Sequence, residues 1–174
     1  MFSNNTKLLC LACLITFFAC NSPTQETGTA SNTNVAAVEA PSSEEQSLTD
    51  VVDGYLLLKD ALVASNAQEA QAKATSMLEV IDATNMMEIQ QSAKHIAAAL
   101  DIDTQRAYFD SLSVHLYDFV ETRNGKERTL YKQYCPMAFN NRGAYWLSSA
   151  KEIRNPYFGD EMLQCGKVEE TLTY

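Results

Sequence analysis

The chain has 174 residues and is acidic, with 13 Lys and Arg against 22 Asp and Glu and a formal net charge of −9. A negative charge balance disfavours binding to nucleic acid or to anionic lipid headgroups. Because the sequence also has no Gly-rich phosphate loop, no Gly-x-Ser-x-Gly and no His-Glu-x-x-His motif, we expect a protein that is not an enzyme and has no nucleic-acid partner.

The first twenty residues are typical of an export signal. Residues 8–18 form an apolar run with one Thr, which is too short to span a bilayer and has the length of a signal-peptide core. Ala19 then precedes Cys20, which resembles bacterial lipoprotein signals, although Phe17 stands where Leu is usual. Cys13 is a second candidate for the acylated residue, and the alternative is an ordinary secreted protein. We expect residues 1–19 to be a lipoprotein signal peptide and Cys20 to carry a membrane anchor facing the bacterial periplasm.

The next segment, residues 20–47, is expected to be a lipid-anchored flexible tether. From residue 21 onward it lacks aromatic residues, Lys and Arg, and it is rich in Ser, Thr, Asn, Gln, Ala and Glu. Such a stretch cannot bury enough apolar surface to offset the entropy lost on ordering. The folded part is then residues 48–174, which is the size of one domain with one core.

Four helices are predicted in the first two thirds of this domain. The first begins near Thr49 or Asp50, the second after a capping-box-like Asn66 and Glu69, the third spans 86–100, and the fourth begins at Asp103 or Thr104. Apolar residues recur at helical spacing in each: Leu48, Val52, Tyr55, Leu58 and Leu62; Ala70, Ala74, Met77, Leu78 and Ile81; Ile89, Ala93, Ile96 and Leu100; Phe109, Leu112, Leu116 and Phe119. Short connections favour a mostly α fold, an antiparallel up-down four-helix bundle.

A different pattern follows the Asn-Gly turn signal at residues 124–125. Residues 129–134 alternate with β-formers, 144–147 have the composition of a short strand, and 168–174 have that of a last strand. We expect a small irregular or β-containing C-terminal cap that folds over one end of the bundle.

Four sulfur residues in this cap form the candidate site. Cys135 and Met137 are two apart, and Met162 and Cys165 are three apart, so that an extended chain and a helical turn respectively would turn each pair to one side. Thiolate and thioether are soft ligands that select Cu(I) and related ions. The four residues are therefore candidate ligands for a Cu(I) ion.

A disulfide is the competing interpretation. Once Cys10, Cys13 and Cys20 are removed or acylated, only Cys135 and Cys165 remain, and an even pair in an exported domain predicts a bridge. It would close a loop of about 30 residues and contribute roughly 3–4 kcal/mol, with the methionines as core fillers. From spacing alone the disulfide is favoured, and the two interpretations exclude each other at any one moment.

The chain resembles a family of domains of unknown function, number 3347. The resemblance lies in residues 133–148 (QYCPMAFNNRGAYWLS), in residues 152–166 (EIRNPYFGDEMLQCG) and in the helical residues 55–62 (YLLLKDAL), and it covers essentially residues 48–174. Members look like bacterial lipoproteins or like modules appended to CusB-type adaptors of copper and silver efflux pumps. The resemblance implies metal handling in the envelope and an efflux adaptor as partner. It also marks a departure, because members often have His where this chain has Tyr134.

Two function hypotheses follow. In the first, an envelope lipoprotein binds Cu(I) through the four sulfur residues and buffers it or passes it to an efflux adaptor. In the second, a disulfide holds an aromatic cap as an interaction module without a metal site, and four aromatic side chains of the cap contact the adaptor: Tyr145, Trp146, Tyr157 and Phe158. His95, His115 and the Met86-Met87 pair are expected to be packed or surface residues.

Overall fold

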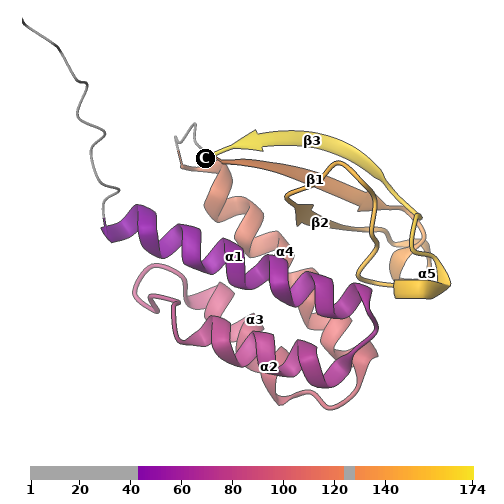
Figure 1. The fold of residues 1–174 in the computed structure, drawn as a ribbon, viewed down its shortest axis with the longest axis horizontal. Helices are drawn as coiled ribbons and strands as arrows, with labels where there is room; N and C mark the ends of the chain where they lie inside the picture. Colours follow the sequence, from indigo (N-terminus) through magenta and orange to yellow (C-terminus); the bar gives the residue numbers. More distant parts are fainter. Residues whose placement is uncertain (1–42, 124–127) are drawn as a thin grey trace, which may run out of the picture. The chain divides into compact units, whose positions relative to one another are not determined.

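The computed structural model describes residues 43–123 and 128–174, with side chains from Gln46 onward. The predicted signal peptide, Cys20, most of the predicted tether and the Asn-Gly turn lie outside the described residues. Four long helices precede a three-stranded sheet (Figure 1). The elements are α1 (Ser43–Val63), α2 (Ala67–Leu78), α3 (Met87–Ala98), α4 (Ile102–Glu121), β1 (Thr129–Cys135), α5 (Ala138–Asn141), β2 (Ala144–Ser148), η1 (Gly159–Glu161) and β3 (Lys167–Thr173).

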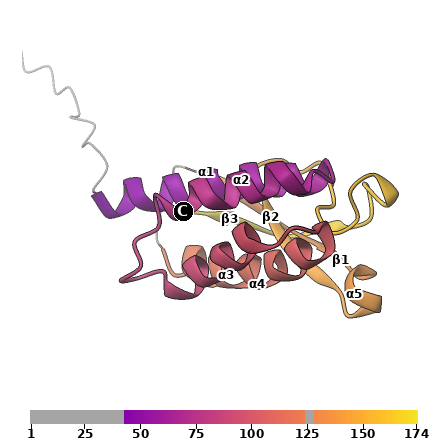
Figure 2. The ribbon, with the colours of Figure 1, turned by 90° about the horizontal axis from the view of Figure 1, so that it is seen from below.

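The helices pack against their neighbours in the chain, as the predicted bundle requires. Figure 2 shows α1 with α2 on one side and α3 with α4 on the other. The predicted apolar faces form the core, and Tyr55, Leu58, Ile96, Phe109 and Leu112 have no exposed surface. The mostly α fold with a small β-containing cap is therefore confirmed.

The helix ends differ from the predicted ones. Helix α1 begins at Ser43, so the last five residues of the predicted tether are helical. The cap of α4 is Asp101, which accepts a hydrogen bond from the Thr104 amide at 2.8 Å. Because α3 ends at Ala98, Leu100 lies between two helices and is 84% exposed instead of buried. The cap of α2 is the predicted one, since the Glu69 amide donates to Asn66 Oδ1 at 3.0 Å.

The sheet is antiparallel with the strand order β2-β1-β3, so the first strand is central (Figure 1). All three predicted strands are present within one residue of the predicted ends. Strand β1 pairs with β2 from Tyr131 opposite Ser148 to Cys135 opposite Ala144. It pairs with β3 as far as Tyr134 opposite Lys167, with a bulge after Lys132. The antiparallel pairing brings the start of β3 next to the end of β1.

Two buried contacts fasten the sheet and its loop to the bundle. The Tyr55 hydroxyl on α1 lies 2.7 Å from Ser113 Oγ on α4 and accepts a hydrogen bond from the Leu147 amide on β2 at 3.0 Å. Arg106 on α4 donates from Nε to the Pro156 carbonyl at 2.9 Å and from Nη2 to Ser65 Oγ at 3.0 Å. Helices and sheet therefore share one core.

A left-handed turn joins β1 to β2. Phe139, Asn140 and Asn141 all have positive φ, at 52°, 58° and 67°. Non-glycine residues rarely adopt this conformation, and Asn does so most readily. The Phe139 ring packs edge-on against Tyr157 with centroids 5.3 Å apart, which holds the least favourable member of the turn in place.

Candidate thiol site

The two cysteines of the folded domain meet at the end of the central strand of the sheet. Cys135 is the last residue of β1, and Cys165 lies two residues before β3. Their Sγ atoms are 2.7 Å apart and are not joined by a bond. Cys135 is completely buried, whereas Cys165 is partly exposed. The structure therefore brings together the two residues on which both the metal and the disulfide interpretations depend.

Burial holds the Cys165 thiol in its protonated form. Burial, followed by the neighbouring Cys135 thiol, raises the pKa of Cys165 from 9.0 to about 11, and the nearby Met137 amide acts in the opposite direction. A thiolate is required for nucleophilic attack and for metal binding. At neutral pH this cysteine therefore has to lose a proton before it can do either.

The two methionines lie in the same segments as the cysteines but in different surroundings. Met137 is 47% exposed at the start of the left-handed turn. Met162 is partly buried, and its carbonyl accepts a hydrogen bond from the Cys165 amide at 2.9 Å. A single turn therefore connects Met162 to Cys165, as the three-residue spacing predicted.

The sulfur ligands suit a soft metal ion, but the two Sγ atoms lie too close together to bind such an ion between them. With metal–sulfur bonds of about 2.3 Å, two sulfurs on one tetrahedral ion lie roughly 3.8 Å apart. The Sγ atoms at 2.7 Å would have to separate by about 1 Å. Within residues 43–123 and 128–174, no group of three His, Cys, Asp or Glu residues is arranged to hold a metal ion.

A partly buried loop, residues 149–166, lies against the sheet next to the cysteines. Gln133 on β1 anchors its start by donating from Nε2 to the Ala150 and Glu152 carbonyls at 2.8 and 3.1 Å. Asn155 anchors its end, because Nδ2 donates to the Cys165 carbonyl at 2.8 Å. Sequence reasoning missed both residues. The only signal was the Asn-Pro dipeptide at Asn155, which is typical of a turn.

The aromatic residues predicted to contact a partner lie inside the domain instead. Trp146 has no exposed surface and Tyr157 is 6% exposed, with ring centroids 5.9 Å apart. Tyr145 and Phe158 are partly buried against the same core. Trp146 and Tyr157 are therefore too deeply buried to contact a partner, whereas Tyr145 and Phe158 keep part of their surface exposed.

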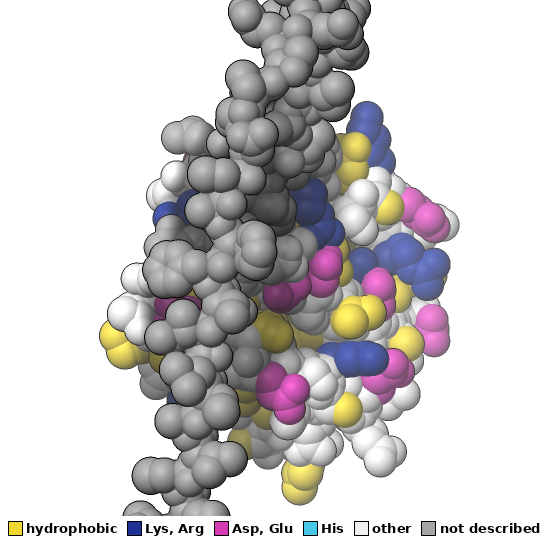
Figure 3. Space-filling view, turned by 60° about the vertical axis from the view of Figure 1, so that its left-hand side comes forward, with side chains coloured by type: hydrophobic (Ala, Val, Ile, Leu, Met, Phe, Trp, Pro, Cys, Tyr) yellow, Lys and Arg dark blue, Asp and Glu magenta, His cyan; other side chains and the backbone are white. Residues whose placement is uncertain are grey.

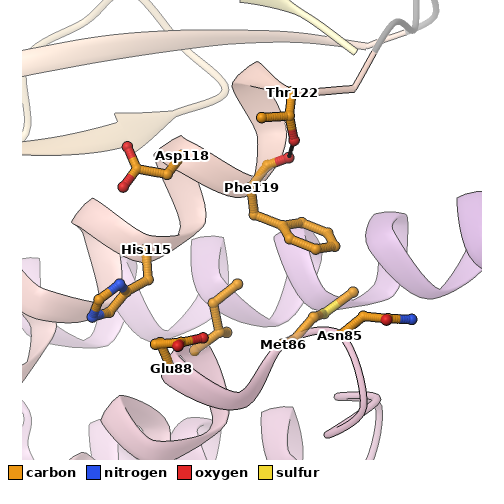
Figure 4. Close-up of a pocket in the computed structure, with 8 residues that line it drawn as sticks. Asn85, Met86, Glu88, His115, Asp118, Phe119 and Thr122 are labelled. Carbon is orange, nitrogen blue, oxygen red and sulfur yellow. Dashed lines mark hydrogen bonds between the residues drawn. The ribbon is translucent and has the colours of Figure 1, made fainter.

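The histidines lie away from the thiols. His95 stacks on Tyr108 with centroids 4.5 Å apart. His115 lines an open groove of about 410 Å³ between α3 and α4, together with Met86, Glu88 and Phe119 (Figure 4). This groove is near the C-terminal end of α4, and β1 carries Cys135 in the direction away from that end (Figure 1).

The visible surface carries both signs of charge. On the face drawn in Figure 3, where the described residues are not covered, Lys and Arg side chains alternate with Asp and Glu, and hydrophobic side chains are scattered between them. None of the helices in the described part of the chain is long and apolar enough to cross a membrane.

These features define a small domain in which a helical bundle supports a three-stranded sheet with a cysteine pair at the end of its central strand. Residues 51–128 match the model of a family described as "Protein of unknown function (DUF3347)", which supports the resemblance found in the sequence. The matched segment covers the helices and ends just before β1, so the thiol site lies beyond it. Neither the curated proteins nor the solved structures contain a match.

Proposed function

We propose that the domain binds a soft metal ion, with Cu(I) as the expected ion, through Cys135 and Cys165 and with Met137 and Met162 as thioether ligands. One observation carries this proposal: two cysteines thirty residues apart in sequence lie side by side, and each has a methionine in its own segment. Soft sulfur ligands favour Cu(I) over harder divalent ions.

Proton release accompanies binding in this proposal. The pKa of Cys165 is raised to about 11, so the thiol gives up its proton only as the ion is bound, and affinity increases with pH. The Sγ atoms move apart by about 1 Å to make room. The exposed position of Met137 lets its thioether reach an ion from the solvent side.

The proposed setting is the bacterial envelope, with the protein held by a lipid anchor at Cys20, buffering the ion or passing it to an efflux adaptor. The lipoprotein-like signal and the family resemblance support this setting. Replacing Cys20 by Ala should release the protein from the membrane fraction and prevent incorporation of labelled fatty acid. If the Cys20→Ala variant still sediments with the membrane and still incorporates fatty acid, Cys20 does not carry the anchor.

The metal proposal is tested by competition for Cu(I). A full chain with Cys10, Cys13 and Cys20 replaced by Ser, reduced before use, is titrated against a chromophoric Cu(I) chelator. We expect one ion per chain, loss of binding when Cys135 and Cys165 are also replaced by Ser, and weaker binding in Met137→Leu with Met162→Leu. Met87→Leu is the matched control, because Met87 is also exposed, at 62%, but lies on α3. Unchanged affinity in the double Met→Leu variant would exclude thioether ligands.

A structural disulfide is the second candidate, and the 2.7 Å separation of the two sulfurs favours it. A bridge would pin the end of the loop to β1 and keep an interaction module rigid without a metal site. Its partner surface would have to lie outside the buried aromatic residues. Intact-mass analysis of air-oxidised protein should show the loss of two hydrogen atoms, and the reduced protein should then fail to compete for Cu(I).

A further inference from the structure

Asn155 is the most extensively bonded residue of the loop beside the thiols. It is fully buried, and its Nδ2 donates to the Cys165 carbonyl at 2.8 Å. Its Oδ1 accepts from the Tyr157 amide at 2.8 Å, and its own amide donates to the Leu163 carbonyl at 2.8 Å. Its carbonyl accepts from the Gly159 amide at 3.0 Å. Four points of the loop are therefore tied to one side chain and its backbone.

Two of these bonds reach the segment that carries the sulfur ligands. Leu163 lies inside the turn that connects Met162 to Cys165, and this turn is closed by the bond from the Cys165 amide to the Met162 carbonyl at 2.9 Å. On its other side Cys165 is followed by Gly166 and β3, whose pairing with β1 fixes the chain. Asn155 therefore supplies the fixed point on the side that the sheet does not hold.

The other buried anchors of the loop act elsewhere. Gln133 holds the carbonyls of Ala150 and Glu152, and Arg106 holds the carbonyl of Pro156. Among the described contacts of these side chains, none reaches residues 162–165. Among these buried side chains, Asn155 is thus the one whose hydrogen bonds reach the segment that carries Cys165.

We propose that Asn155 is the positioning residue of the thiol site: it holds residues 162–165 against Cys135 and thereby sets how readily the two sulfurs join, either to each other or around a soft ion. The metal part of this inference rests on the proposed function, whereas the thiol part does not. Ligands held by buried hydrogen-bonding residues lose less freedom on binding, so their removal weakens the site without touching a ligand.

The test measures the thiol–disulfide equilibrium of the pair in the full chain that keeps only Cys135 and Cys165. The reduced protein reacts with glutathione disulfide to give the bridged protein and two molecules of glutathione, so the two thiols lose two hydrogen atoms to the oxidant. Alkylation at fixed times and intact-mass analysis give the equilibrium constant. In Asn155→Leu we expect this constant to fall on the order of fivefold or more, which matches the loss of one buried hydrogen bond.

The matched control is Gln105→Met, which removes a fully buried amide that donates to the Ala67 and Ala99 carbonyls at 2.9 and 3.0 Å in the helical part. It should lower stability in a similar way and leave the equilibrium constant within about twofold. Equal changes in both variants, or an unchanged constant in Asn155→Leu, would overturn the proposal. If circular dichroism shows that Asn155→Leu does not fold, Asn155→Asp serves instead, because it keeps the acceptor for the Tyr157 amide and loses the donor to Cys165.

Cu(I) competition on the same variants separates this inference from the proposed function. Weaker Cu(I) binding in Asn155→Leu, with normal binding in Gln105→Met, supports both. If the parent protein does not compete for Cu(I), the proposed function fails, and the glutathione equilibrium still decides whether Asn155 positions the thiols.

Discussion

Replacing Tyr55 by Phe should weaken the attachment of the sheet to the helices. The hydroxyl is fully buried and serves two partners, Ser113 Oγ at 2.7 Å and the Leu147 amide at 3.0 Å. Phenylalanine fills the same space, so only the polar contacts are lost. A buried donor or acceptor left unpaired costs about 1–3 kcal/mol. Because the change leaves the buried Leu147 amide without this acceptor, we expect a loss of about 2 kcal/mol.

Urea unfolding followed by far-ultraviolet circular dichroism measures this loss, with an unchanged dependence on urea concentration as the check that the folded state is the same. Tyr108→Phe is the control, since this partly exposed ring keeps its stacking on His95 and should change stability by less than about 0.5 kcal/mol. A Tyr55→Phe protein as stable as the parent would show that the Leu147 amide finds another partner. The Tyr55 hydroxyl would then not be a contact that attaches the sheet to the helices.

Three further outcomes are expected. Gly143→Ala should lower the free energy of unfolding by at least about 2 kcal/mol, because φ is +80° and the new Cβ would lie 2.0 Å from the Tyr134 hydroxyl oxygen; a loss below 0.5 kcal/mol in urea would contradict this. Arg106→Met should cost about 2 kcal/mol in the same assay, whereas the exposed Arg142→Met should cost less than 1. In reduced protein, alkylation of Cys165 should reach half its maximal rate near pH 11, since the folded thiol stays neutral after the unfolded one has ionised near 9.0. Stability should therefore fall between pH 9 and 11, and Cys165→Ser should remove this part of the fall.

The helices could be predicted from the sequence because their periodicity records which side faces the core. Leu48, Val52 and Leu62 are buried where the spacing placed them. Helix ends were less predictable because several residues near an end can act as caps. Asp101 and Asp103 both have the right side chain, and only the extended backbone at Asp101 decides between them.

The candidate site was predicted in its residues but not in its surroundings. A separation of thirty residues does not determine whether Cys135 and Cys165 meet; the bulged pairing of β3 with β1 does, and it depends on the whole sheet. Trp146 was expected at the surface because a sequence does not show that a loop will cover it. The bonds of Asn155 reach carbonyls eight and ten residues further along, a distance over which no local pattern operates.

The left-handed turn after β1 has a consequence for the chirality of the residues in it. At Phe139, Asn140 and Asn141 the backbone adopts the mirror image of the ordinary helical conformation, which l-residues tolerate poorly and d-residues prefer. Semisynthesis with d-alanine at position 140, an exposed site, should therefore stabilise the domain relative to l-alanine there. Mirror-image residues, usually disruptive in a folded protein, would here match the backbone beside the thiol pair.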